Sequence, residues 1–337
     1  MSLTPSSVSL YHYNAAEFKT EDNFVLDNFE GLDKAGHVNW VNIIGLHDKE
    51  LLQKAAHVFG IHPLMMEDIT NPIQRAKIED YGDNLYIVLR AFALIDGKIE
   101  DQQISFLLRD NVLVSFAEKN FGLFQPFLSK LMNGAGAQAR KKGEDFLLYQ
   151  LLDILIDNYY FVLRSVDEQI ERLDHDILER PNDHHLIDLQ RLKTDVLYIR
   201  KNILPVRELI GNLNRHEVTY FDADNKYFLR DLHDHMQRNV EELDFQREQL
   251  NSLMDLFYNL QTHKMNNVMK TLTTVSFVIM PLTFIASLYG MNIKIPRSED
   301  PNAFWELIGI MGGIAVLLLV FAFTRNWLSS RDFQGKQ

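Results

Sequence analysis

The tetrapeptide Tyr289-Gly290-Met291-Asn292 follows an apolar segment and offers one amide side chain but no charge. The amide of Asn292 and the backbone carbonyl of Gly290 can hydrogen-bond water that is bound to a cation. They cannot replace that water, because Mg²⁺ gives up its hydration shell reluctantly. Gly290, Met291 and Asn292 are therefore expected to form a selectivity filter that contacts a largely hydrated cation and releases it easily.

The segment before this tetrapeptide carries small and polar side chains along one side. A stripe of this kind also occurs where membrane helices pack closely together. Here its alignment with Gly290, and the presence of two methionines and an asparagine, favour the lining of a pore. Apolar constrictions formed by Met280, and by Leu272 or Met269, are expected to exclude water. The predicted pore-lining residues are Asn266, Met269, Leu272, Thr273, Ser276, Met280, Thr283 and Ser287.

Two uncharged runs have the length of membrane spans. They extend from Thr271 to Ile293 and from Leu307 to Thr324. As helices they measure about 34 Å and about 27 Å, against a hydrocarbon core of roughly 30 Å. One chain with two spans cannot enclose a pore, so we expect a pore built by several copies. A very long helix, with apolar residues at steps near three and four from about Asp222, is predicted to run into the first span.

The remainder of the 337-residue chain is long enough for a core of its own. Its start has neither a basic nor an apolar leader, so we expect this part in the cytosol, with both termini on the cytosolic side of the plasma membrane. A formal charge of −12 argues against nucleic acid as a partner. No phosphate-binding glycine loop or nucleophile constellation is present, so we predict no enzyme activity.

The predicted organisation combines a cytosolic α/β domain with a helical stalk and two membrane helices. Short β-branched runs at 85–89, 104–108 and 112–116 indicate strands, and 51–59 reads as a helix that ends at Gly60. A later helix is expected to end at Gly211. The predicted parts are the α/β domain 1–140, acidic helices 141–220, stalk and first span 221–292, external loop 293–306, second span 307–325 and cytosolic tail 326–337.

Acidic residues gather between Glu144 and Asp188, where twelve carboxylates accompany three arginines. Such a region is either a solvated helix face or, when repeated in an oligomer, a surface that attracts cations. Metal ligands could also come from the histidines, which occur close together at His184-His185 and at His233 and His235. Adjacent or i, i+2 positions on a helix point in different directions, so these side chains are interpreted as solvated.

The chain resembles the CorA family of divalent-cation channels in several segments that occur in the family's order. The resemblance covers about residue 60 to the C-terminus and implies a homopentameric funnel, whose long helices surround the pore while the second span lies outside it. The matching segments are His62-Pro63-Leu64, Glu67-Asp68-Ile69, Leu178-Glu179-Arg180-Pro181, Phe228-Leu229-Arg230-Asp231, Met280-Pro281-Leu282-Thr283-Phe284-Ile285 and the exit tetrapeptide.

The resemblance also implies a regulatory metal site. In the family, carboxylates between cytosolic domains bind Mg²⁺ and close the channel. The matching positions are Glu67 and Asp68 of one subunit and Asp231 of its neighbour, with Asp157 as a looser match. The expected function is inward movement of Mg²⁺, and also of Co²⁺ and Ni²⁺, through the lipid bilayer. A Zn²⁺ transporter and a membrane Mg²⁺ sensor that does not conduct are the alternatives.

Overall fold

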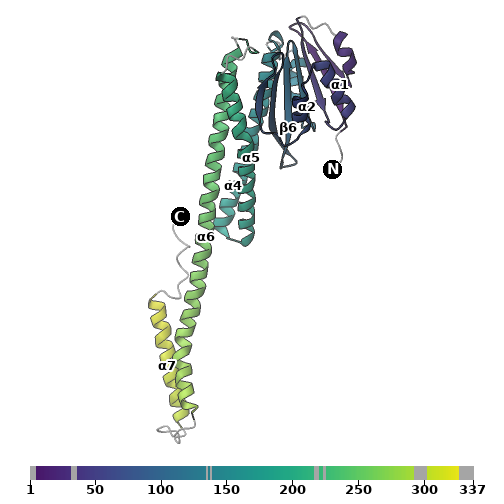
Figure 1. Cartoon of the computed structure of the whole chain (residues 1–337). Helices are drawn as coiled ribbons and strands as arrows, with labels where there is room; N and C mark the ends of the chain where they lie inside the picture. Colours follow the sequence, from purple (N-terminus) through teal and green to yellow (C-terminus); the bar gives the residue numbers. More distant parts are fainter. Residues whose placement is uncertain are drawn as a thin grey trace. The chain divides into compact units, whose positions relative to one another are not determined.

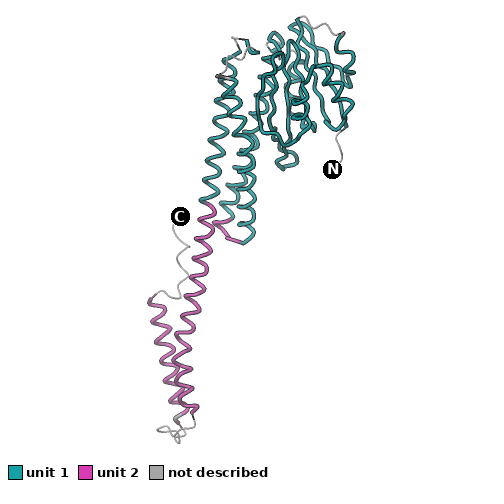
Figure 2. Tube along the Cα trace, in the orientation of Figure 1, with its two compact units in different colours: residues 1–176, 183–252 teal, residues 177–182, 253–337 magenta. Residues whose placement is uncertain are grey.

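The computed structural model describes residues 5–31, 36–133, 136, 139–215, 220–222, 225–291 and 302–325. The chain forms two compact units, which Figure 2 distinguishes by colour. Unit 1 comprises residues 1–176 and 183–252, and unit 2 comprises residues 177–182 and 253–337. The predicted boundaries near 140 and 220 therefore fall inside unit 1.

A seven-stranded mixed sheet is the centre of unit 1 (Figure 1). Its spatial order is β2-β1-β3-β7-β6-β5-β4, and only the β3–β7 pair is parallel. The three predicted strands are confirmed as parts of β5, β6 and β7. The strands are β1 Ser7–Tyr13, β2 Phe18–Asp22, β3 Val38–Ile44, β4 Lys77–Asp80, β5 Leu85–Ile95, β6 Lys98–Arg109 and β7 Val112–Ala117.

Helices cover both faces of this sheet. Helix α1 (Lys49–Phe59) and helix α2 (Pro63–Thr70) pack their apolar residues on one face. The predicted end of α1 is confirmed, because Gly60 adopts the left-handed conformation with φ 62°. On the other face, the hydroxyl of Tyr159 in α4 (Glu144–Glu179) donates to the carbonyl of Arg90 in β5. Short helical segments lie at Leu26–Gly31, Gln125–Met132 (α3) and Ala139–Lys141.

Helices α4, α5 (Asp183–Arg215) and α6 (Lys226–Tyr289) follow. Helix α5 continues past Gly211, contrary to the prediction, because Leu213 is only 1% exposed and its burial outweighs the low helix propensity of one glycine. Two amides fix the register between α4 and α6. The Asn239 side chain donates to the carbonyl of Ile156 at 3.0 Å, and that of Gln246 donates to the carbonyl of Leu163 at 2.8 Å.

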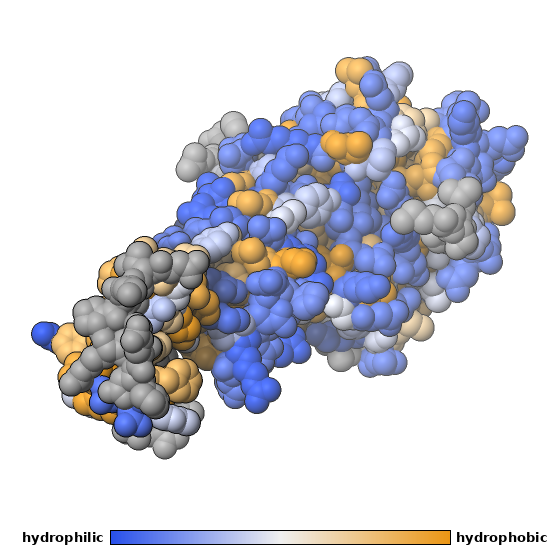
Figure 3. All heavy atoms as spheres, turned by 90° about the horizontal axis from the view of Figure 1, so that it is seen from below, coloured by the Kyte–Doolittle hydropathy of each residue, from blue (hydrophilic) through white to orange (hydrophobic). Residues whose placement is uncertain are grey.

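Unit 2 contains the second half of α6 and helix α7 (Ala303–Thr324). Thr274 in α6 and Ala322 in α7 are 1% and 0% exposed, which indicates that the two helices pack against each other. Figure 3 shows apolar side chains (orange) at the surface of unit 2. Residues 292–301, which include most of the predicted external loop 293–306, and the predicted tail 326–337 lie outside the described residues.

Among the described residues, three helices are long and apolar enough to cross a membrane: α4, α6 and α7. They differ in burial, since 56% of the apolar window of α4 lies inside the protein but only 6% of the windows of α6 and α7 does. Helix α4 uses its apolar residues for the core of unit 1. Helices α6 and α7 expose theirs, as membrane spans do.

Candidate metal centre and ion path

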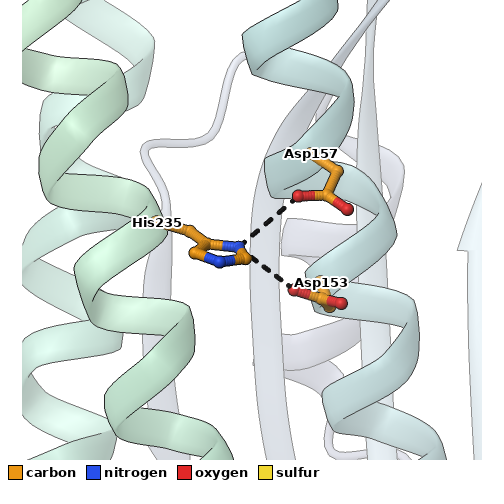
Figure 4. A group of neighbouring side chains, drawn as sticks. All are labelled: Asp153, Asp157 and His235. Atoms are coloured by element: carbon orange, nitrogen blue, oxygen red, sulfur yellow. Dashed lines mark ion pairs between the residues drawn. The ribbon is translucent and has the colours of Figure 1, made fainter.

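Three side chains in unit 1 form a candidate metal centre. Asp153 and Asp157 project from α4 toward His235 of α6 (Figure 4). The imidazole Nδ1 lies 3.6 Å from Asp153 Oδ1 and 3.5 Å from Asp157 Oδ1. Its Nε2 lies 3.8 Å from Asp231 Oδ1. One imidazole therefore stands among three carboxylates.

The spacing of these residues explains why they meet. Asp153 and Asp157 are four residues apart and so share one face of α4, as Asp231 and His235 share one face of α6. The neighbouring amide of Asn239 holds the two helices in register through its hydrogen bond to Ile156. The centre thus depends on the pairing of two helices that are far apart in the sequence.

The distances at this centre suit a shared ion better than direct hydrogen bonds. At 3.5 to 3.8 Å, the contacts of His235 are too long for ordinary hydrogen bonds. Ligand atoms about 2.1 Å from one cation stand about 3.0 to 4.2 Å from one another. Asp153 Oδ1 is also buried without a hydrogen-bond partner. A cation bound here would satisfy that oxygen.

The electrostatics of the centre point the same way. Burial, and next the negative charge of Asp157, raise the pKa of Asp153 to about 6. Ionisation of Asp153 therefore costs more than that of a solvated aspartate, and a positive charge beside it would offset this cost. Carboxylates suit Mg²⁺, whereas an imidazole ligand favours Co²⁺, Ni²⁺ or Zn²⁺. The centre combines both kinds of ligand.

The four predicted regulatory residues occupy two places. Asp157 and Asp231 both lie beside His235, whose side chain is 29% exposed and therefore only partly solvated. Glu67 is exposed on α2, and Asp68 is 8% exposed and paired with Lys77 at 2.7 Å. In the described part of the chain neither belongs to the His235 group. Their predicted partner is a neighbouring subunit.

Asp153 and His235 escaped the sequence analysis as ligands, although a signal was present. The two i, i+4 pairs, Asp153 with Asp157 and Asp231 with His235, each place two potential ligands on one helix face. The ligands meet only across two helices, a pairing that the spacing within His184-His185 and His233–His235 does not indicate.

The predicted pore stripe lies on the surface of α6. All eight residues from Asn266 to Ser287 are exposed within the chain. At about 100° per residue they lie nearly opposite the covered side of α6, which includes Thr274, Val278 and Ile285. Helix α6 ends at Tyr289, where the Gly290 N–H still donates to the carbonyl of Ala286 at 3.0 Å. Met291 follows in a bend, and Asn292 lies outside the described residues.

Comparison with known proteins identifies the family. The profile of the CorA-like Mg²⁺ transporter proteins matches residues 35–325. The chain belongs to this family. It is 32% identical to the cobalt/magnesium transport protein CorA of Thermotoga maritima over 324 residues, which cover 95% of this chain and 92% of that protein.

Two further relatives differ from each other in the ion that they are named for. The zinc transport protein ZntB of Pectobacterium carotovorum is 22% identical, over 87% of this chain and 92% of that protein. The complete structure of the CorA magnesium transporter from Methanocaldococcus jannaschii matches with a TM-score of 0.82 and 18% identity, covering 97% of this chain and 100% of that chain. The fold of that structure is shared.

Family membership gives the general function. The chain is a divalent-cation transporter of the CorA superfamily and not an enzyme. It is a membrane protein with a soluble cytoplasmic domain and C-terminal transmembrane helices. The predicted fold class, a cytosolic α/β domain followed by a long helix and a second membrane helix, is confirmed.

Proposed function

We propose that this chain forms a homopentameric channel that carries Mg²⁺, and also Co²⁺ and Ni²⁺, into the cell and is closed by intracellular Mg²⁺. The observation that carries the proposal is the uncharged stripe on α6, exposed on the side away from the residues that α7 covers. A ring of such helices would place Thr273, Ser276 and Thr283 around a common axis. Their hydroxyls suit the water of a hydrated ion.

The membrane potential supplies the driving force. Moving two positive charges inward through 100 mV gains about 4.6 kcal/mol, so nucleotide hydrolysis is unnecessary. At the outer end, the amide of Asn292 and the carbonyl of Gly290 would contact the ion through its water. Because neither group is charged, the ion remains free to leave.

Closure rests on the carboxylates of unit 1. Asp157 and Asp231 of one subunit, with Asp153 and His235 beside them, would hold Mg²⁺ together with Glu67 and Asp68 of the adjacent subunit. An ion shared by two subunits stabilises only the conformation in which both supply ligands. At a concentration tenfold above Kd, one site contributes about 1.4 kcal/mol. Five sites together contribute roughly 7 kcal/mol, enough for a sharp switch.

Zn²⁺ is the second candidate cargo, and two observations favour it. The superfamily includes relatives named as zinc transport proteins, and His235 supplies the type of nitrogen ligand that Zn²⁺ prefers. Against it, the exit tetrapeptide and the uncharged first span resemble the magnesium and cobalt branch. A membrane sensor that does not conduct would have no use for the stripe on α6.

Flux through the purified protein in liposomes tests these possibilities. Mg²⁺, Co²⁺, Ni²⁺ and Zn²⁺ are supplied outside in turn, with Mg²⁺ inside at low or high concentration. We expect uptake of the first three ions, and inhibition by internal Mg²⁺. Uptake of Zn²⁺ alone would support the second candidate, and the absence of any flux in a correctly assembled protein would support the sensor.

A further inference from the structure

Asp68 already has a cation beside it in the isolated chain. Its carboxylate Oδ2 lies 2.7 Å from the ammonium Nζ of Lys77 in β4. The same ammonium lies 2.9 Å from Glu79 Oε1, and the hydroxyl of Tyr81 donates to Glu79 Oε2 at 2.8 Å. One lysine therefore stands between two carboxylates.

The surrounding elements hold this arrangement in place. The side chain of Gln103 in β6 donates to the backbone carbonyl of Asp68 at 2.7 Å and so fixes the last turn of α2. Lys77 is anchored by its position in β4, where it pairs with Val88 of β5. The side chains of Lys77 and Asp68 are 32% and 12% exposed, so bulk water screens their attraction only in part.

Lys77 also keeps its charge. Burial tends to lower the pKa of its ammonium, but the hydrogen bonds that it donates to Asp68 and Glu79 outweigh that effect, and the net pKa is raised. A lysine ammonium carries its charge at cytosolic pH in any case, because its ordinary pKa is about 10.4. A metal ion that approaches Asp68 meets a carboxylate with one oxygen already occupied.

We infer that Lys77 is a built-in competitor of the regulatory cation at Asp68 and sets the intracellular Mg²⁺ concentration at which the channel closes. This inference rests on the proposed closure by Mg²⁺. Binding of Mg²⁺ to Asp68 must either displace Lys77 toward Glu79 or place a divalent cation close to an ammonium. Both weaken the binding of the ion, which keeps the channel open at low internal Mg²⁺.

Removal of the ammonium tests the inference. The full-length protein in detergent is digested with a protease over a series of MgCl₂ concentrations, and the midpoint of protection is measured. For Lys77→Met we expect a midpoint about tenfold lower than in the wild type, because Asp68 is left with an unpaired buried charge that favours Mg²⁺. Lys77→Arg keeps the charge and should remain within about twofold of the wild type.

Two controls separate competition from a general change of charge. Lys119→Met removes another paired lysine of unit 1, which lies 3.1 Å from Glu100, and should leave the midpoint unchanged. In an Asp68→Asn background, Lys77→Met should lose its effect, because the group for which Lys77 competes is gone. If Lys77→Met does not assemble, Lys77→Gln takes its place, since it removes the charge but keeps a donor.

The outcomes distinguish a failure of the proposed closure by Mg²⁺ from a failure of the role of Lys77. A wild type without any Mg²⁺-dependent protection contradicts the proposed closure itself. A protected wild type whose midpoint stays the same or rises in Lys77→Met, or falls equally in Lys119→Met, overturns the role of Lys77 alone. A midpoint that falls only when the charge at position 77 is lost, and only while Asp68 is present, supports it.

Discussion

The two halves of α6 differ sharply in the number of carboxylates that they carry. From Lys226 to Ser252 the helix belongs to unit 1 and carries six carboxylates, whereas from Leu253 to Tyr289 it belongs to unit 2 and carries only Asp255. The first half supplies Asp231 and His235 to a charged centre, and the second supplies a stripe of hydroxyls and thioethers. In the proposed mechanism, charged ligands retain a cation in the first half, and neutral groups allow it to pass in the second.

This difference follows from what each site must do. A sensor has to remain occupied for long enough to stabilise one conformation, so direct carboxylate ligands are suitable. A pore has to release every ion that enters, so contacts through water are suitable. Substitutions in one half at a time test this difference. A change of regulation caused by the second half, or a change of conduction caused by the first, would contradict it.

The largest effect is expected at the exit of the neutral half. Asn292→Ala should reduce Mg²⁺ flux into liposomes about 100-fold or more, because it removes the amide that contacts the water of the ion. The size-exclusion profile should stay that of the wild type. Near-normal flux through the variant would remove Asn292 from the selectivity filter.

The charged half should respond in regulation and not in conduction. In the double variant Asp157→Asn/His235→Gln we expect the Mg²⁺ midpoint of protease protection to rise about tenfold or more, with flux retained at low internal Mg²⁺. Glu171→Gln, at an exposed carboxylate of the same helix α4, is the matched control and should change neither quantity. A loss of flux with an unchanged midpoint would assign the centre to conduction instead.

The stripe on α6 could be predicted from the sequence, whereas the charged centre could not, and the reason is physical. The neutral stripe lies within one helix, so periodicity alone located it, and the structure places all eight residues on an exposed side of α6. The charged centre joins α4 and α6, and its ligands are up to 82 positions apart in sequence, between Asp153 and His235. Only the pairing of helices through Asn239 and Gln246 brings them together.

The sheet shows the same limit. Strands β5, β6 and β7 each contain a short β-branched or aromatic run that could be recognised locally. Strands β1 and β3 lie in the first fifty residues, for which no strand is predicted, and the parallel pairing of β3 with β7 links Trp40 to Leu113. Such a contact depends on the core that surrounds it and not on local sequence. The competing position of Lys77 beside Asp68 also became visible only through such packing.

A smaller effect is expected in the middle of the neutral half. Met280 is 72% exposed on the stripe side of α6 and is predicted to form an apolar constriction. Met280→Ser should raise the basal Mg²⁺ leak at high internal Mg²⁺ several-fold, because a hydroxyl lets water enter the constriction. Met280→Asp should reduce assembly, since repetition in an oligomer brings like charges together in a membrane.

The reference for this test is Val275, which is 47% exposed and lies off the stripe. Val275→Ser introduces the same hydroxyl at a different angle on the helix and should leave the leak unchanged. An equal leak in both variants, or none in Met280→Ser, would mean that the stripe is used for packing.

The smallest effect concerns the stability of the charged half. Burial and the charge of Asp157 raise the pKa of Asp153 from 3.8 to about 6 in the folded protein. For a carboxylate with a raised pKa, the stabilising contribution is complete below the unfolded value and is lost as the pH rises through the folded value. Without divalent ions, the protein should therefore lose stability between about pH 4 and pH 6 on account of this group.

Asp153→Asn removes that loss, because an amide does not ionise. In chelator at pH 7.5 we expect the variant to be more stable than the wild type by about 1 to 2 kcal/mol, seen as a melting temperature a few degrees higher. At pH 4 the two should melt alike. Excess Mg²⁺ should reverse the order at pH 7.5, because the metal stabilises the wild-type carboxylate and not the amide. A variant that is less stable than the wild type in chelator would show that His235 already compensates the negative charge of Asp153. The centre would then need no metal to hold its two helices together.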